Sequence, residues 1–326
     1  MTTATTTLQR AADHLAALLL APSGGLRDPG GSDLAFEEAV EPRPLTALAP
    51  PHDVWAVDGG QALVADARCV QVHVTRAART RFHRGACVLE DAGELRACVL
   101  GDRAAREAAL ASLGIDGLDP KTVVDVGLLR DRWEWDAAQR CVAEAEPGGL
   151  VLVDGDLEAD WRLPATVVEG LLAAAAERHV LVAAVTKHTS LSRGGAPLLG
   201  QLELEAEAAL GRRARWWAPV ARSRGGARIQ VVAARLDADA RFAFRIDLPA
   251  GVDPVEALGR LAAVADDAAF PGYPYALAVA DRLAACPGWV RAEAWLQLDD
   301  LLARAGVASG VRERAFTDRH RLLERS

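Results

Sequence analysis

The segment that decides the fold is Gly148-Gly149-Leu150-Val151-Leu152-Val153-Asp154-Gly155-Asp156-Leu157. Its four consecutive apolar residues, 150–153, predict a short strand that is buried on both faces. Asp154 and Asp156 follow directly, separated by one glycine. Open α/β sheets bind their ligands at the carboxyl ends of their strands. The segment therefore predicts a buried strand with carboxylates at its functional end.

A second segment repeats this pattern earlier in the chain. Its apolar run Val54-Trp55-Ala56-Val57 predicts another buried strand, and Asp58-Gly59-Gly60 predicts the turn that ends it. Two buried strands that each end in an aspartate indicate a divalent-metal site, since Mg²⁺ and Mn²⁺ prefer oxygen ligands. A single Asp-Gly after a strand is more often only a turn, so the inference depends on the two segments together.

Hydrophobic periodicity predicts a mixed α/β order along the rest of the chain. Strands are expected at 54–57, 62–75, 86–89, 95–100, 150–153, 180–185, 229–235 and 240–248. Helices are expected at 7–20, 102–113, 129–145, 165–178, 201–213, 253–268, 275–285 and 291–305. Antiparallel strands come first and a strand–helix–strand order follows, which is the arrangement of a ribonuclease H-like mixed central sheet flanked by helices.

No break in composition divides the chain, so we expect one domain over residues 1–326. Its expected parts are an N-terminal helix at 7–20, an arm rich in Pro and Gly at 21–51, a core at 52–305 and a charged tail at 306–326. The arm is interpreted as a connection or a partner contact rather than as part of the sheet.

Composition limits the classes of partner. The net charge of −8 gives no overall basic field, so any binding of nucleic acid must come from local patches. No apolar run is long enough for a membrane span, and the first residues lack the basic start of a signal peptide. These features predict a cytoplasmic protein without a membrane contact.

Four acidic residues fit the metal ligands of a ribonuclease H-like nuclease. Such enzymes hold two divalent ions with carboxylates that come from separate elements. Asp58 and Asp154 take two strand positions, Glu134 a position on the helix before the central strand, and Asp281 one on a late helix. Glu134 and Asp281 also fit ordinary surface acids of a helix. The set as a whole predicts a metal centre.

Short motifs over residues 50–281 resemble the NurA family, the nucleases that work with the HerA ATPase in DNA end processing. They occur in the family's order: Val57-Asp58-Gly59-Gly60, Arg130-x-x-x-Glu134, Leu152-Val153-Asp154-Gly155-x-Leu157, Val185-Thr186-Lys187-His188-Thr189-Ser190, Phe244-Arg245-Ile246-Asp247 and Tyr273-Pro274-x-x-Leu277-x-x-Ala280. Each motif is weak alone, and the resemblance depends on their order.

The resemblance implies a ribonuclease H-like, PIWI-like core and Mn²⁺- or Mg²⁺-dependent cleavage of DNA. The expected activity is that of a 5′–3′ exonuclease or a single-strand endonuclease, acting in DNA end resection, repair or defence. It also implies a homodimer docked on a HerA-like hexameric ATPase. Asp58, Glu134, Asp154 and Asp281 would bind the ions.

Two departures from the family pattern stand out. The family usually carries His after the Ala of the Tyr-Pro motif, where this chain has Asp281. Aspartate still suits Mn²⁺, so the change leaves metal binding possible in chemical terms. The family also tends to carry Ser at the positions of Gly60 and Asp156. Asp156 fits either an additional ligand or a solvated turn residue.

Other residues fit contacts with DNA. Lys187 follows a predicted strand and would neutralise a phosphate, and Tyr273 would position a phosphate or a base. Both residues also fit ordinary structural roles: Lys187 as a solvated surface lysine, and Tyr273 as part of a Tyr-Pro turn that caps a helix. The acid-free segment 211–228 holds six arginines with Trp216 and Trp217 between them, and arginine for phosphate with indole for base stacking is what a single-strand groove needs. Its expected DNA contacts are Arg212, Arg213, Arg215, Trp216, Trp217, Arg222 and Arg224.

Two other functions compete with the nuclease. The Asp154-Gly155-Asp156 sequence resembles a haloacid-dehalogenase-like phosphatase, with Asp154 as nucleophile and Asp156 as acid–base. The usual Thr two residues later is absent, because position 158 is Glu158. The second alternative is a non-catalytic structural partner of a DNA motor, and Asp281 in place of His is its sequence support.

Overall fold

The two apolar runs pair as neighbouring parallel strands in the computed structural model, which describes residues 3–20, 24–30, 33–115, 118–119, 121–224 and 228–317. Val54 lies opposite Leu150, and the register continues to Val57 opposite Val153. All four residues of 54–57 and all four of 150–153 are buried. Burial on both faces is what the unbroken apolar runs predicted.

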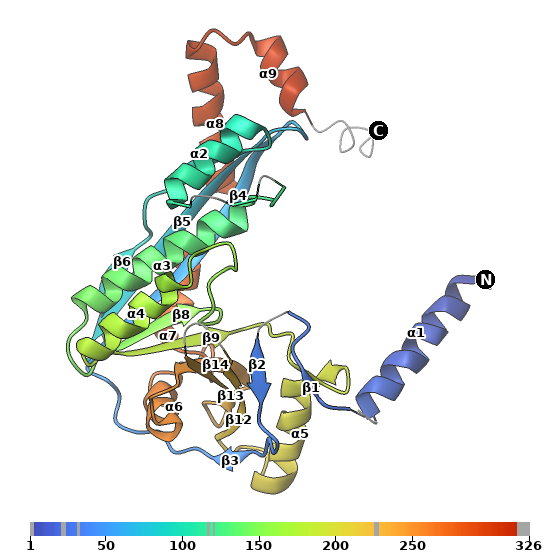
Figure 1. Ribbon diagram of the computed structural model, residues 1–326, viewed down its shortest axis with the longest axis vertical. Coiled ribbons are helices and arrows are strands. Elements are labelled where there is room, and N and C mark those ends of the chain that lie inside the picture. Colours follow the sequence, from blue (N-terminus) through green and yellow to red (C-terminus); the bar gives the residue numbers. More distant parts are fainter. Residues whose placement is uncertain are drawn as a thin grey trace. The chain divides into compact units, whose positions relative to one another are not determined.

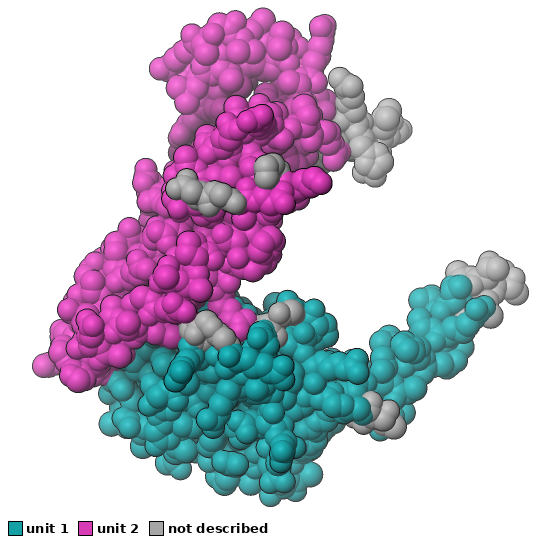
Figure 2. Space-filling model, viewed as in Figure 1, with its two compact units in different colours: residues 1–51, 154–157, 181–275 teal, residues 52–153, 158–180, 276–326 magenta. Residues whose placement is uncertain are grey.

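The chain divides into two units by its internal contacts (Figure 2). Unit 1 comprises residues 1–51, 154–157 and 181–275, and unit 2 comprises 52–153, 158–180 and 276–326. Both are built from strands and helices (Figure 1).

Unit 2 is built on a strand order of β8-β4-β5-β6, with β7 also paired to β5. The β4–β8 pair is parallel, and the other pairs are antiparallel. Helix α3 packs across β4 and β5, and α4 packs on α3. The strands are β4 (Asp53–Asp66), β5 (Gln71–His83), β6 (Ala86–Asp91), β7 (Arg96–Leu100) and β8 (Leu150–Asp154). The helices are α2 (Arg103–Leu113), α3 (Val126–Glu144), α4 (Thr166–Glu177), α7 (Tyr275–Ala284), α8 (Gly288–Arg304) and α9 (Ser309–Phe316).

The predicted turn at Asp58-Gly59-Gly60 is wrong, because β4 runs straight through it as a strand of 14 residues. The hairpin to β5 closes later, at residues 67–70. A Cβ on Gly59 would lie 1.8 Å from Glu134 Oε1 on α3, and one on Gly60 would lie 1.8 Å from the carbonyl oxygen of Ala284 in α7. Successive strand residues face opposite sides of a sheet. The two glycines therefore make room for close neighbours on both faces.

Unit 1 has the strand order β2-β12-β13-β14-β9, with β3 also paired to β12 and a small sheet β1-β10-β11 beside it. All of these pairs are antiparallel. The strands are β1 (Leu26–Arg27), β2 (Leu34–Phe36), β3 (Arg43–Pro44), β9 (Leu181–Thr186), β10 (Ser192–Arg193), β11 (Ala196–Pro197), β12 (Trp216–Ser223), β13 (Ile229–Arg235) and β14 (Phe244–Pro249). The helices are α1 (Thr3–Leu20), α5 (Leu198–Leu210) and α6 (Pro254–Ala262).

Two interpretations of unit 1 are corrected. The arm at 21–51 is part of the sheet in its described residues, because β2 and β3 pair along β12. These short strands satisfy the outer edge of β12, which would otherwise expose unpaired backbone groups. The segment 211–228 contains the strand β12, which the periodicity analysis missed. Residues 21–23, 31–32 and 225–227 lie outside the described residues.

At the ends of the chain, α1 begins earlier than the predicted helix 7–20, and the expected tail at 306–326 contains α9. Residues 318–326 of that tail lie outside the described residues. None of the helices in the described part of the chain has the length and apolar character needed to span a bilayer.

Substituting Gly60 with alanine is expected to destabilise the protein by about 1–3 kcal/mol, since the new methyl group overlaps a backbone oxygen that cannot rotate away. Urea unfolding measures this as a lower midpoint. Gly170→Ala is the control, because Gly170 lies in α4 with open space around it, and there alanine should stabilise the helix by about 0.5–1 kcal/mol. Equal midpoints for the two variants would contradict the close approach of α7.

Candidate metal centre

Asp58 lies in the middle of β4, and its side chain is buried. Its Oδ1 accepts a hydrogen bond of 2.7 Å from the backbone N–H of Gly59. Asp58 and Asp154 each follow a residue of the last β4–β8 register pair, Val57 opposite Val153. The strand register thus brings the two aspartates to neighbouring positions where the β4–β8 pairing ends.

Helix α7 brings the third aspartate. Its first turn is held to β5 by Thr80, whose hydroxyl donates a 3.1 Å hydrogen bond to the carbonyl oxygen of Ala276. Its last turn is held by Arg76, whose Nε donates to the carbonyl oxygen of Ala284 over 3.1 Å. Arg76 lies opposite Gly60 in the β4–β5 register. With both ends fixed on the strand pair, α7 has a set position for Asp281.

Asp58, Asp154 and Asp281 form one acidic cluster. One carboxylate oxygen from each lies within 4.8 Å of the other two. Asp58 is buried, Asp154 is half-buried and Asp281 is exposed. Carboxylates at this spacing repel one another unless a cation or a proton joins them. Hard oxygen donors from separate elements are what Mg²⁺ and Mn²⁺ bind. The donor set therefore fits a divalent cation.

Glu134, the fourth predicted ligand, approaches β4 from α3. Its Oε1 occupies the space that a Cβ of Gly59 would need. The same oxygen lies 3.0 Å from Nε of Arg130, one helical turn earlier. The cluster of three found among the described residues does not include it. Glu134 of α3 thus lies beside Gly59, the residue that follows Asp58 in β4.

Lys187 and Tyr273 both contact Asp154. Lys187 Nζ lies 3.0 Å from Oδ2 of Asp154, and the Tyr273 hydroxyl donates a 3.3 Å hydrogen bond to Oδ1. The ammonium also lies 5.3 Å from the centre of the Tyr273 ring. The ring itself is buried against Phe244, at 5.4 Å between centroids. The two residues fix the orientation of the Asp154 carboxylate, a role that the sequence did not suggest for Tyr273.

The turn after Asp154 is held by backbone contacts with β9. Gly155 adopts φ = 106°, which favours glycine, and its N–H donates to the carbonyl oxygen of Val185 over 3.1 Å. The hydroxyl of Thr186 donates to the carbonyl oxygen of Gly155 over 2.6 Å. Asp154 and Lys187 follow directly from these anchored strand ends, which explains their contact.

Asp156 is not among the three residues of the acidic cluster, and it lies near Arg245. Its Oδ2 lies 3.8 Å from Nη1 of the buried Arg245. Arg245 also donates two 2.9 Å hydrogen bonds to Asp247, and Asp247 Oδ2 accepts from the N–H of Leu157 over 3.2 Å. This network holds the segment 154–157. It also gives Asp154 and Asp156 separate surroundings, which disfavours a phosphatase in which the two act together.

The tryptophans of the basic segment are core residues. Trp216 and Trp217 of β12 are 1% and 5% exposed, so neither indole offers a face to a DNA base. Their expected role in base stacking is therefore corrected. Five of the eight residues of β12 are buried, and because successive strand residues face opposite sides of a sheet, the two indoles fill the interior on both faces. Trp216 and Trp217 were expected to contact DNA only because the strand was missed.

The arginines of this segment remain at or near the surface, with partners of their own. Arg213 pairs with Asp239, and Arg215 Nη2 lies 2.8 Å from Asp237 Oδ2. Arg222 Nε lies 3.2 Å from Glu37 Oε1, and Arg224 Nη1 lies 3.9 Å from Asp33 Oδ1. Arg212 is exposed. Their binding to DNA stays a prediction.

Sequence reasoning missed Arg76 and Thr80, the residues that position α7. Both lie in β5, in the second half of the β4–β5 hairpin. Placing that hairpin's turn at 67–70 sets Arg76 opposite Gly60, whereas its contact with α7 depends on long-range packing that no local pattern contains. The signal was hidden because Asp-Gly-Gly is itself a strong turn sequence.

Comparison with solved structures shows which fold the chain has. No family model and no curated protein sequence matches the chain. The crystal structure of the NurA nuclease from Sulfolobus solfataricus is similar at a TM-score of 0.57 and 15% identity, over 91% of this chain and 95% of that one. A second NurA structure gives 0.43 at 8% identity, over 74% and 86%, and human endonuclease V gives 0.41 at 15%, over 75% and 86%.

The likeness to the Sulfolobus protein shows that the two chains share a fold. The mixed sheet expected from the order of elements is confirmed, with parallel and antiparallel pairs and flanking helices. The NurA resemblance of the motifs is thereby confirmed at the level of the fold.

Substituting Gly59 with alanine should displace the Glu134 carboxylate and weaken Mn²⁺ binding about tenfold or more, as changes around metal ligands do. The fold should survive, because the overlapping atom is the end of a flexible side chain. Loss of the free Mn²⁺ signal in electron paramagnetic resonance measures the affinity, with Gly170→Ala as control. Equal affinity in both variants would mean that Glu134 has no influence on the ion.

Proposed function

We propose that the protein is a divalent-metal-dependent deoxyribonuclease that hydrolyses phosphodiester bonds. The observation that carries the proposal is the acidic cluster of Asp58, Asp154 and Asp281 where the β4–β8 pairing ends. It occurs in a chain that shares its fold with a NurA nuclease. Three carboxylates around one point suit the cation that phosphodiester hydrolysis uses.

The ions would be Mn²⁺ or Mg²⁺, held by Asp58, Asp154 and Asp281, with Glu134 as the fourth ligand. Bound there, they supply Lewis-acid chemistry toward the phosphodiester and the attacking water. The donor set contains only carboxylate oxygens, which favours these hard cations over softer metals. Asp281 in place of the family's histidine is consistent with this choice, since it adds one more oxygen donor.

The residues around Asp154 would prepare the site for an anionic substrate. Lys187 pairs with Asp154 over 3.0 Å, and its charge is available to a phosphate once a cation takes over the carboxylate. Tyr273 holds the other oxygen of Asp154 in place. Both residues would hold the carboxylate in one orientation before the substrate arrives.

We further propose the context that the NurA resemblance implies: a homodimer that acts with a HerA-like hexameric ATPase on single strands or duplex ends in the cytoplasm. The motif order over residues 50–281 and the shared fold support this assignment. The exposed arginines Arg212, Arg222 and Arg224 would contribute contacts to the DNA backbone.

Cleavage of end-labelled single- and double-stranded DNA tests the proposal. Wild type should cleave with Mn²⁺ or Mg²⁺ and not with EDTA. Asp58→Asn and Asp154→Asn should each lose about 100-fold or more in rate, because a lost ligand removes several kcal/mol of charge stabilisation. Asp300→Asn, which changes an exposed acid that pairs with Arg304, is the matched control and should cleave normally.

Absence of cleavage by wild type with every metal, and also with its ATPase added, would contradict the nuclease. The remaining function would then be a non-catalytic partner of a DNA motor, with Asp281 as the mark of a decayed site.

A further inference from the structure

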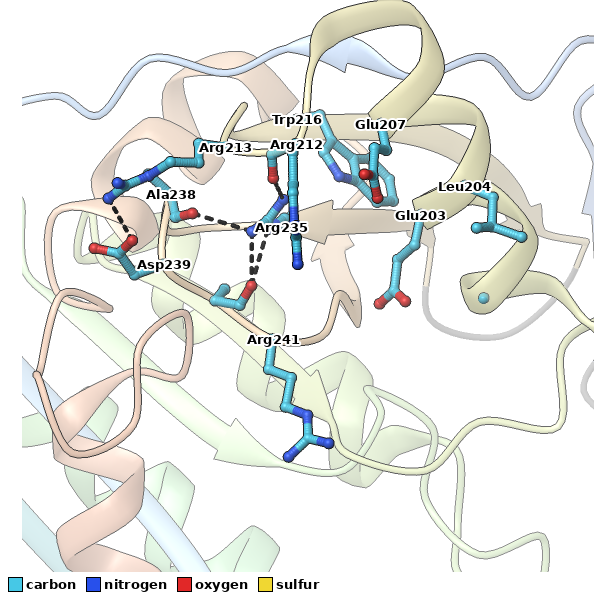
Figure 3. A pocket seen from close by; sticks show the side chains of 12 residues that line it. Glu203, Leu204, Glu207, Arg212, Arg213, Trp216, Arg235, Ala238, Asp239 and Arg241 are labelled. Carbon is cyan, nitrogen blue, oxygen red and sulfur yellow. Dashed lines mark hydrogen bonds and ion pairs between the residues drawn. The ribbon is translucent and has the colours of Figure 1, made fainter.

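A separate pocket of about 660 Å³ opens in unit 1, a volume typical of small-molecule sites. Helix α5 forms one wall, and the loops that follow α5 and β13 form the other (Figure 3). Glu203 and Leu204 come from the helix, and Arg212 and Arg241 come from the loops. A free nucleotide or the last nucleotide of a strand fits such a volume.

The loop wall is basic. Arg213 pairs with Asp239, and Arg235 donates to the carbonyl oxygens of Ala238 and Ala240 over 3.0 and 2.8 Å, so these two cations already have protein partners. Arg241 points away from Arg212 and Glu203 in Figure 3, and its guanidinium group lies 5.3 Å from the centre of the Phe242 ring. For the guanidinium group of Arg212, the described residues supply no carboxylate within ion-pair distance. Exposed guanidinium groups at a concave surface are suited to bind a phosphate.

The helix wall is acidic and partly apolar. The N–H of Ala243 donates to Oε1 of Glu203, which fixes the carboxylate. Burial raises the pKa of Glu203 from its ordinary value, in line with its half-buried position. Leu204 beside it is 72% exposed, and the buried Trp216 closes the floor. This wall offers an acceptor for an amino group and an apolar surface for a ring.

We propose that this pocket binds a nucleotide, with its phosphate on Arg212 and the amino group of its base on Glu203. The inference rests on the proposed function, which supplies nucleotides as strand ends and as products. Acidic side chains accept hydrogen bonds from the N4 amino group of cytosine, and thymine has no such group. The pocket should therefore prefer deoxycytidine monophosphate (dCMP) to thymidine monophosphate (dTMP).

The test is a titration of the full-length Asp154→Asn variant with dCMP, dTMP, deoxycytidine and inorganic phosphate, by calorimetry in EDTA. Neither metal nor cleavage enters this measurement. We expect dCMP to bind more tightly than any of the other three. Arg212→Ala should weaken dCMP binding about tenfold or more. Arg103→Ala, an exposed arginine on α2 that pairs with Glu107, is the charge-matched control and should leave the affinity unchanged.

Glu203→Gln keeps an oxygen that can accept from Ala243, so the variant should fold, and its urea midpoint checks this. It should remove the preference for dCMP over dTMP, which we expect to be about tenfold. Equal binding of dCMP and inorganic phosphate, or equal affinities in Arg212→Ala and Arg103→Ala, would overturn the proposal. So would a preference for dCMP that survives in Glu203→Gln.

A 5′-phosphorylated oligonucleotide beginning with dC separates the two sources of the nucleotide. Tighter binding of the oligonucleotide than of dCMP supports capture of a strand end, and equal binding supports a site for the free product. If the wild-type protein fails to cleave DNA while its Asp154→Asn variant binds dCMP, the proposed function alone is refuted. Cleavage without dCMP binding would refute the pocket alone.

Discussion

The close approach of two helices to β4 is the constraint on which the candidate metal centre depends. Glu134 on α3 occupies the space beside Gly59, and the carbonyl oxygen of Ala284 in α7 occupies the space beside Gly60. Neither position admits a side chain without movement. The pair of glycines thereby lets one strand carry a buried aspartate while an acid from each neighbouring helix reaches the same few residues of backbone.

Crowding carboxylates in this way works against stability and indicates function. Like charges a few ångströms apart repel, and the burial of Asp58 removes water that would screen its charge. Lys187 and the Tyr273 hydroxyl offset part of this repulsion at Asp154. The Arg245–Asp247 pair is buried and hydrogen-bonded, and it holds the segment that follows Asp154. This cluster is the observation on which the proposed metal site rests.

The sequence was informative where one residue pattern dictated one structure. Unbroken apolar runs predicted the β4–β8 pair, and the order of strands and helices predicted the mixed sheet. Three of the four predicted acids, Asp58, Asp154 and Asp281, lie close together. The β4–β8 register and the position of α7 bring these residues, which are distant in the sequence, near one another in space. The shared fold with the Sulfolobus NurA structure agrees with the motif order.

The errors arose where one residue type serves two physical purposes. Glycine permits turns and also close packing, so Asp58-Gly59-Gly60 was interpreted as a turn inside what is a continuous strand. Tryptophan suits both interfaces and cores, and the missed strand β12 made Trp216 and Trp217 look exposed. The pairing of 34–36 and 43–44 with β12 depends on long-range contacts that no local pattern contains.

Anomalous X-ray diffraction from crystals soaked in Mn²⁺ would locate the metal relative to the three aspartates. We expect a manganese peak about 2 Å from carboxylate oxygens of both Asp58 and Asp154, with Asp281 in the same coordination sphere. Manganese bound elsewhere, or a peak that touches only one of the two strand aspartates, would contradict this expectation.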